Sequence, residues 1–199
     1  MEKITYVTDN YKKYMHTKEL FDKNEISLNY FDCSFKKPTT KDITEVSKLE
    51  AEESYKVIGN PVIVTKTGLY IEDYPKNRDY PGVLLKESGI SENIEKLLND
   101  MKGVVNRNCC FINCLTYYDG TNLKQFYCSN FGYLLEEAEE LNSIYDLFVP
   151  TSSSKPLSKL TEEERIRLYD GRVYVQNQFF TWYKKYMKNG NKVYQKTII

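Results

Sequence analysis

The sequence lacks the features that mark a nucleic-acid-binding or membrane protein. Its 199 residues contain 28 Lys plus Arg and 28 Asp plus Glu, so no net charge attracts nucleic acid or an anionic membrane surface. No apolar run is long enough to span a bilayer. We therefore expect neither a membrane partner nor a nucleic-acid partner, although these totals still allow a local basic site.

Residues that hold metals or form disulfides are also scarce. His16 is the only histidine, no two cysteines form a C-x-x-C pair, and the five cysteines are odd in number. Because the N-terminus also lacks a secretory apolar segment, this pattern predicts reduced thiols in a cytoplasmic protein. Cys109, Cys110 and Cys114 lie in an apolar, strand-like run, which predicts that they are small core residues.

Strand and helix patterns alternate along a chain that is long enough for one domain with a sizeable core. Asp42 and Glu45 have the spacing of a helix N-cap and its partner, and Asp119-Gly120 predicts a hairpin turn. The expected strands cover residues 3–8, 26–31, 62–64, 69–71, 109–117 and 123–131, and the expected helices cover about 11–21, 43–57, 92–101 and 162–190.

The centre of the chain, residues 61–86, carries the most informative pattern. The apolar run Val62 to Val64 predicts a buried strand that ends at the polar pair Thr65-Lys66. Gly68 predicts a sharp exit before a second short strand. Since α/β proteins usually bind ligands where a buried strand ends, we expect a ligand here.

A second polar segment follows the first expected strand. Thr8, Asn10 and Lys13 have the spacing T-x-N-x-x-K and lead into a helix. The N-terminus of a helix presents unpaired N–H groups and a positive dipole, which favour an anion. The alternative interpretation is an ordinary capped helix with exposed lysines.

These segments, together with SIYDLFVP at residues 143–150 and EERIRLYDGR at residues 163–172, occur in an order that resembles the inosine triphosphate pyrophosphatase family. That family clears non-canonical purine triphosphates. The resemblance extends from residue 3 to about residue 180. It implies a single α/β domain over residues 1–199, with a bilobed fold, a central twisted mixed sheet flanked by helices, and a nucleotide cleft between the lobes. It also implies a homodimer, formed with help from a second-lobe hairpin at about residues 107–135.

The resemblance assigns two groups of site residues. Tyr145 is expected to stack on the base, at about 1–3 kcal/mol, although an ordinary aromatic residue at a sheet edge is an equal alternative. The expected phosphate-binding residues are Thr8, Asn10, Lys13, Lys66, Lys86 and Arg165. The expected base-binding residues are Tyr145, Asp146, Phe148, Tyr169, Asp170 and Arg172.

The chain departs from the family where the family keeps its acidic side chains. Thr65-Lys66 stands in place of an acidic pair, and Phe35 stands at a third acidic position, with Asp32 as the nearest carboxylate. Cleavage between the α and β phosphates needs Mg²⁺ and a carboxylate that orients water. We therefore expect no catalytic residue, no metal ligand and no cofactor, and a lysine clamp that holds a triphosphate without metal.

A pocket that binds a nucleotide without cutting it is typical of a sensor. The chain resembles the pyrophosphatase-like subunit of the Kongming anti-phage system, which is paired with a sirtuin-like NADase and responds to deoxyinosine triphosphate. One alternative is an active, Mg²⁺-dependent pyrophosphatase whose metal has moved to Glu72 and Asp73. A third hypothesis is a structural subunit with a vestigial pocket, which binds a partner through the acidic residues 136–140.

Overall fold

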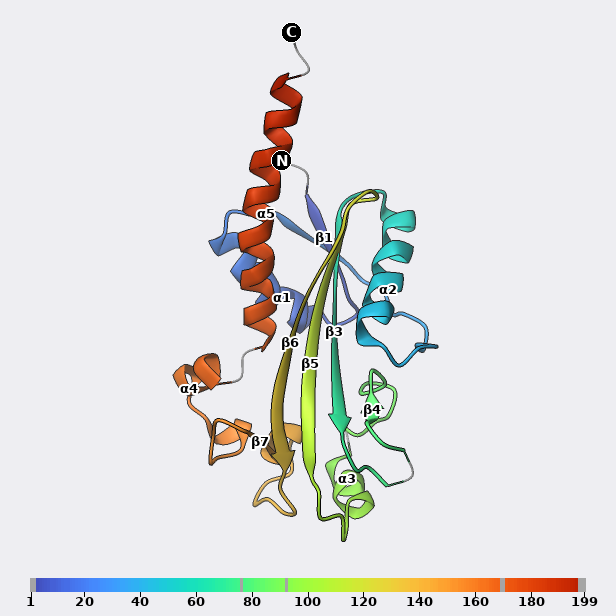
Figure 1. Cartoon of the computed structure of the whole chain (residues 1–199), viewed down its shortest axis with the longest axis vertical. Coiled ribbons are helices and arrows are strands. Elements are labelled where there is room, and N and C mark those ends of the chain that lie inside the picture. The colour runs from blue at the N-terminus through green and yellow to red at the C-terminus, as the bar shows by residue number, and fades with distance from the viewer. Residues whose placement is uncertain (1–2, 76, 92, 169–170, 197–199) are drawn as a thin grey trace.

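The computed structural model describes residues 3–75, 77–91, 93–168 and 171–196, and within them seven strands form one mixed sheet (Figure 1). The strand order is β2-β1-β3-β5-β6-β7, and β4 pairs with β3. The strands are β1 (Ile4–Val7), β2 (Leu28–Phe31), β3 (Val62–Ile71), β4 (Tyr80–Gly82), β5 (Asn108–Tyr118), β6 (Leu123–Leu134) and β7 (Phe148–Pro150). The α-helices are α1 (Tyr11–Lys23), α2 (Ile43–Ile58), α3 (Ile94–Asp100), α4 (Glu162–Leu168) and α5 (Gly171–Lys196), and the 3-10 helices are η1 (Ile144–Asp146) and η2 (Leu157–Lys159).

The long strand β3 is the centre of the sheet, and the expected break at Gly68 was wrong. The strand continues through Thr65, Lys66 and Gly68 and pairs with β5 along its whole length. A side chain at position 68 would place Cβ 2.8 Å from the ring of Tyr70 and 3.0 Å from the carbonyl oxygen of Gly82. The glycine therefore allows a close approach of β4 rather than an exit from the strand.

One edge of β3 is only partly covered. The parallel strand β1 pairs with it at Val62 and Ile63, and the antiparallel strand β4 pairs with it from Leu69 to Ile71. In the described residues, the segment between these two pairings has a neighbouring strand on the β5 side alone. The gap leaves backbone groups in the middle of β3 accessible to a ligand.

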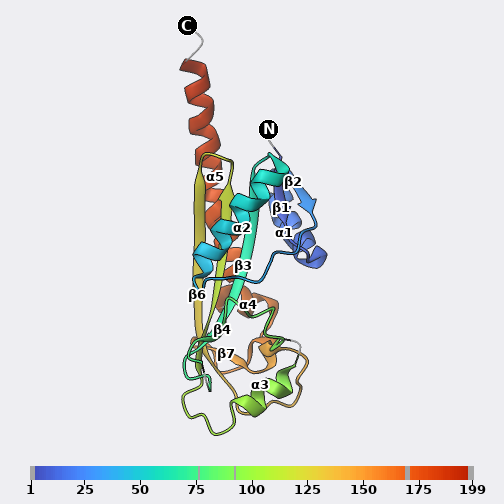
Figure 2. The ribbon, with the colours of Figure 1, turned by 90° about the vertical axis from the view of Figure 1, so that its right-hand side faces the viewer.

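Helices cover both faces of the sheet (Figures 1 and 2). Helix α2 packs on one face, where Ser47 hydrogen-bonds to Thr116 of β5 at 2.7 Å. Helices α1 and α5 pack together on the other face, where Phe21 of α1 stacks on Phe179 of α5. Asp42 caps α2, as its sequence pattern predicted.

On the α5 face, the side chains of β3 and β5 divide into two apolar cores with a polar strip between them. Ile63 belongs to the core under α1 and α5, whereas Leu69 belongs to the core around α3 and β7. Between them lie Thr65 and Thr67, and Thr67 donates a hydrogen bond to Asn113 of β5 at 2.9 Å. This polar strip separates the two lobes of the α/β fold, and it forms the floor of the cleft between them.

The β5–β6 hairpin turns at the expected place, but it contributes to both cores. Cys109 and Phe111 lie in the core around α3 and β7, which we call the lower core. Leu115 and Tyr117 lie in the core under α1 and α5, which we call the upper core. The hairpin is therefore shared by both lobes rather than confined to the second. Of the three clustered cysteines, Cys109 and Cys114 are buried and Cys110 is half-buried.

Two helix expectations need correction. The capping box of Thr161 and Glu164 is present, but it begins the short helix α4, and a separate helix α5 begins at Gly171. The helix expected to start at Ser91 is capped instead by Asn93. Among the described residues, no helix is both long and apolar enough to cross a membrane.

Candidate functional site

A cleft with two connected chambers lies over the gap in β3. The first chamber has a volume of about 460 Å³ and the second about 730 Å³. Charged groups line the first chamber from both lobes, and more apolar side chains line the second. Seven residues line both chambers: Lys13, His16, Thr65, Lys66, Thr67, Tyr145 and Arg172.

The loop between β1 and α1 forms one wall of the first chamber. Asn10 is the N-cap of α1 and accepts the N–H of Lys13 at 2.9 Å, while Thr8 accepts the N–H of Asn10 at 3.2 Å. These bonds place the positive end of a 13-residue helix at the chamber wall. The capped-helix interpretation of this motif and its expected place beside a ligand are therefore both compatible with the geometry.

Lys13 reaches from α1 to the uncovered edge of β3. Its Nζ donates to the carbonyl oxygen of Thr65 at 3.2 Å. Desolvation, together with the nearby charges of Arg172 and Lys66, lowers the pKa of Lys13 from its usual 10.5 to about 7. A cation held under such conditions is stabilised by an incoming anion, because the anion offsets both the burial and the repulsion.

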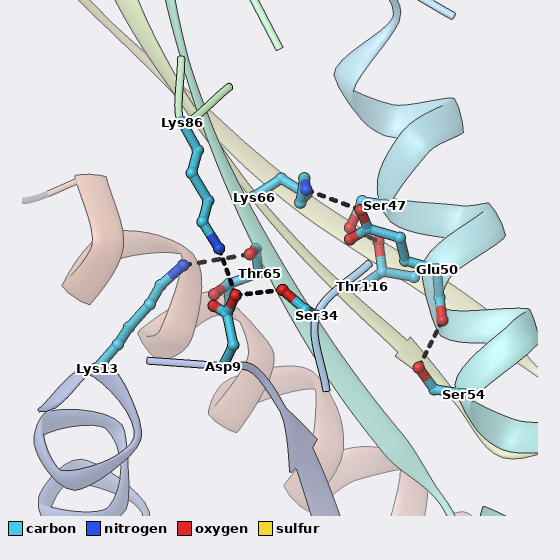
Figure 3. A network of polar contacts seen from close by, with 10 residues as sticks. All are labelled: Asp9, Lys13, Ser34, Ser47, Glu50, Ser54, Thr65, Lys66, Lys86 and Thr116. Atoms are coloured by element: carbon cyan, nitrogen blue, oxygen red, sulfur yellow. Dashed lines mark hydrogen bonds and ion pairs between the residues drawn. The ribbon is translucent and has the colours of Figure 1, made fainter. Parts of the chain in front are cut away.

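Lys66 points to the α2 side of β3, where it meets a carboxylate that sequence analysis missed (Figure 3). Its Nζ donates to Oε1 of Glu50 at 2.7 Å. The Lys66 side chain is 19% exposed and the Glu50 side chain 7%. Lys66, which we expected to bind phosphate, is therefore already paired with the carboxylate of Glu50.

Lys86 makes a second pair across the mouth of the first chamber (Figure 3). It follows β4 and binds the carboxylate of Asp9, which also accepts a hydrogen bond from Ser34 at 2.7 Å. The hydrogen bond from Lys86 is the main reason that the pKa of Asp9 lies below its usual value. Both carboxylates that the lysines meet in this chamber are thus already neutralised.

Tyr145 and Arg172 of the expected base-binding group line the cleft, whereas Asp146 and Phe148 do not. Phe148 is fully buried and packs edge-on against Phe111 in the lower core, so it cannot stack on a base. Asp146 accepts the backbone N–H groups of Asn142 and Ser143 at 2.8 Å each and shapes its own loop. Tyr169 and Asp170 lie outside the described residues.

Arg165 lines the second chamber, as Lys13 and Lys66 do, but it does not line the first. It lies on α4 beside the second chamber, and its Nη2 donates to the carbonyl oxygen of Leu157 at 3.3 Å. The expectation for Arg165 rested on the family resemblance, in which it stands for a phosphate-facing lysine.

The beginning of α5 supplies a feature that the sequence interpretation did not contain. Gly171 sits so close to the polar strip that a Cβ there would lie 2.4 Å from Oδ1 of Asn130. The N-terminus of a long helix, with Arg172 beside it, therefore meets the cleft. Gly171 was the available signal, because a glycine inside an apparently continuous helix indicates a boundary or a close contact.

The described residues place three carboxylates, those of Asp9, Glu50 and Glu87, in the lining of the first chamber. However, the described residues contain no group of three or more His, Cys, Asp or Glu side chains that could hold a metal ion. Glu72 and Asp73 both accept hydrogen bonds from Asn106 at 3.1 Å and do not line either chamber. Phe35 does line the first chamber, with Lys66 Nζ 5.9 Å from its ring centre, whereas Asp32 does not.

Comparisons with known proteins agree with this architecture. The model of the Ham1 family matches residues 4–170. The chain is 24% identical over 186 residues to a dITP/XTP pyrophosphatase of Saccharolobus solfataricus, covering 92% of this chain and 95% of that protein. It is 25% identical over 185 residues to a dITP/XTP pyrophosphatase of Methanopyrus kandleri, covering 92% and 96%.

Solved structures show the same fold. A HAM1 protein from Coxiella burnetii matches with a TM-score of 0.76 at 17% identity, covering 93% of this chain and all of that one (100%). The Ham1 protein of Staphylococcus aureus matches with a TM-score of 0.72 at 18% identity, covering 92% and 99%. These likenesses confirm the expected α/β fold.

Proposed function

Since the chain belongs to the Ham1 family, we propose that its cleft binds a non-canonical purine nucleoside triphosphate, such as deoxyinosine triphosphate, and holds it without hydrolysis. The triphosphate lies in the first chamber, against Lys13, Lys86 and the N-terminus of α1. The base extends toward the second chamber, past Tyr145 and Arg172. Both chambers open onto the same polar strip, so one extended ligand can occupy them together.

The observation that carries the proposal is the Lys66–Glu50 pair. An ammonium group stands where the family resemblance leads us to expect a metal-holding acid, and the nearest carboxylate is 2.7 Å from it. The ammonium group of Lys66 opposes the binding of a divalent cation at this place, and it attracts a phosphate that displaces Glu50 from it. The chamber therefore favours a metal-free polyphosphate over a metal-bound one.

A nucleotide held between two lobes can regulate a partner, because a ligand that contacts both lobes favours their closed arrangement. We propose that this chain is a cytoplasmic sensor subunit in an anti-phage defence system, with an effector such as a sirtuin-like NADase as its partner. A homodimer is part of the same proposal. The outer face of β6, where Tyr127 and Phe131 are 63% and 64% exposed, suits such an interface.

The alternative is an active pyrophosphatase that converts inosine, deoxyinosine or xanthosine triphosphate to the monophosphate. Two observations favour it: the relatives named above are dITP/XTP pyrophosphatases, and the carboxylate of Glu50 lines the first chamber. A carboxylate at that place can orient a water molecule toward a phosphorus atom.

Two measurements separate these functions. The purified protein is incubated with inosine, deoxyinosine and canonical purine triphosphates in the presence of Mg²⁺, and pyrophosphate is quantified. We expect no release, and multiple turnovers would establish the enzyme instead. Calorimetry with the same nucleotides in EDTA should show binding, whereas a vestigial pocket would give no heat with any of them.

A further inference from the structure

The carboxylate of Glu50 is buried, and only part of its hydrogen-bonding capacity is used. Glu50 is 5% exposed, and only one of its two oxygens has a hydrogen-bond partner. Its Oε2 is buried and has no partner in the part of the chain that the structure describes. A buried carboxylate that uses half of its acceptors is poorly compensated for the loss of water.

The surroundings of Glu50 make it depend on Lys66. Burial raises the pKa of Glu50, while Lys66 and, more weakly, Lys13 oppose that rise. The other titratable groups that face it are Glu87, from the loop after β4, and the thiol of Cys33, from the loop after β2. Lys66 is therefore its main counter-ion, and the two side chains satisfy each other in the absence of a ligand.

The Lys66–Glu50 pair also occupies the ammonium group of Lys66, which an anionic ligand would need to contact. Lys66 lines both chambers, and Glu50 lines the first. An anion that contacts Lys66 must replace a carboxylate at 2.7 Å, at a largely buried site where charge–charge attraction is screened little. The Lys86–Asp9 pair differs, because the Lys86 side chain is 68% exposed and its attraction is screened by water.

We propose that Glu50 is a specificity-determining residue, whose carboxylate occupies Lys66 until a polyphosphate chain displaces it. This inference rests on the proposed nucleotide site and deepens it. A triphosphate engages Lys13, Lys86 and the N-terminus of α1 at the same time, so it gains enough elsewhere to break the buried pair. A monophosphate reaches fewer of these groups and leaves the pair intact. Glu50 thereby selects polyphosphates over the far more abundant monophosphates.

The test uses inorganic tripolyphosphate in EDTA, because this probe reports the phosphate site without a base. Glu50→Gln removes the competing charge and keeps the shape, and we expect it to bind tripolyphosphate about tenfold more tightly than the wild type. Glu53→Gln makes the same charge change on an exposed part of α2 and should leave the affinity unchanged. In a Lys66→Gln background, Glu50→Gln should have a much smaller effect, since the two residues act mainly through one contact.

Each outcome decides the matter. If the wild type binds tripolyphosphate and Glu50→Gln binds it equally or more weakly, the inference is wrong while the proposed site stands. If neither tripolyphosphate nor deoxyinosine triphosphate binds the wild type or any variant, the proposed function fails and the inference fails with it.

A second measurement does not depend on the folding of Glu50→Gln. In a crystal structure of the wild-type chain with tripolyphosphate, Lys66 Nζ should contact a phosphate oxygen, and Glu50 should lie beyond hydrogen-bond distance from it. An intact Lys66–Glu50 pair beside bound tripolyphosphate would overturn the proposal.

Discussion

The two chambers of the cleft are built from different kinds of residue, although they share the same polar floor. The first is lined by charged groups on loops and helix starts, such as Asp9, Lys13 and Lys86. The second is lined largely by side chains of α1, η2, α4 and α5, including Leu157, Leu160 and Gln176. The charged groups of the first chamber suit a phosphate chain, and the second chamber has apolar side chains, such as Leu157 and Leu160, against which a flat base can lie.

The difference indicates where substitutions can change ligand recognition while the fold is kept. In the first chamber the site rests on backbone features that the topology fixes: the end of β1, the start of α1 and the gap in β3. In the second, it rests largely on side chains of the helices α1, η2, α4 and α5. We expect changes in the first chamber to affect every polyphosphate and changes in the second to affect only ligands with a base.

The largest expected effect is that of Lys66→Glu. The substitution removes a cation and places a second carboxylate against Glu50, so metal-free tripolyphosphate should bind about 100-fold more weakly. Calorimetry in EDTA measures the change, and Lys56→Glu, an exposed substitution on α2, is the control. Unchanged affinity would mean that Lys66 does not touch phosphate.

Tyr145→Ala should distinguish the chambers from each other. If Tyr145 stacks on the base, deoxyinosine triphosphate loses about 1–3 kcal/mol of binding free energy, while tripolyphosphate binds as before. Phe148→Leu, in the buried core below, should lower stability and leave both affinities in place. Equal losses for the two ligands would place Tyr145 on the phosphate side.

The affinity for tripolyphosphate should fall as pH rises above 7. Lys13 has a pKa of about 7 in the free protein, and a bound anion raises it. The contribution of protonated Lys13 to binding is therefore fully present below pH 7. It is lost as the pH rises, so the affinity falls by up to about tenfold per pH unit. The groups that act on Lys13 are Arg172, Lys66, Glu50 and Asp9.

The pH profile is measured between pH 7 and 9 for both the wild type and Lys13→Arg, so that the titration of the ligand itself affects the two proteins alike. Lys13→Arg keeps its charge throughout this range and should flatten the profile. A wild-type profile that is already flat would show that Lys13 does not respond to the anion.

The smallest expected effect is that of Arg165→Ala. Because Arg165 faces the second chamber and bonds to Leu157, its loss should change tripolyphosphate affinity less than about threefold, in the range of screened surface charges. A tenfold loss of affinity in the same calorimetric titration would show that Arg165 is one of the phosphate-binding residues.

Much of the fold could be predicted from local pattern. The N-cap Asp42, the capping box at Thr161 and the hairpin turn at Asp119-Gly120 all act over a few residues, so short stretches specify them. The order of the motifs was also sufficient for the family. Boundaries that depend on distant contacts could not be predicted, and for that reason Gly68 was misinterpreted and Gly171 was overlooked.

The candidate site could be predicted only in part. Thr8, Asn10 and Lys13 follow from one local unit, and the structure brings them together with Lys66 and Lys86. Phe148 was placed in the site because SIYDLFVP at residues 143–150 resembles a family segment, yet the Phe148 side chain is buried in the core. The direction of a side chain in a short loop depends on packing that the loop sequence does not contain.

The sequence by itself determined the family, the α/β alternation and the replacement of an acidic pair by Thr65-Lys66. Only the tertiary structure decided what that replacement does, because the charge of Lys66 takes its meaning from Glu50, which is 16 residues away in the chain and on another element. Local pattern sets which groups a strand carries, whereas the effect of a charge depends on burial and on the nearest opposite charge, and both are properties of the packed molecule.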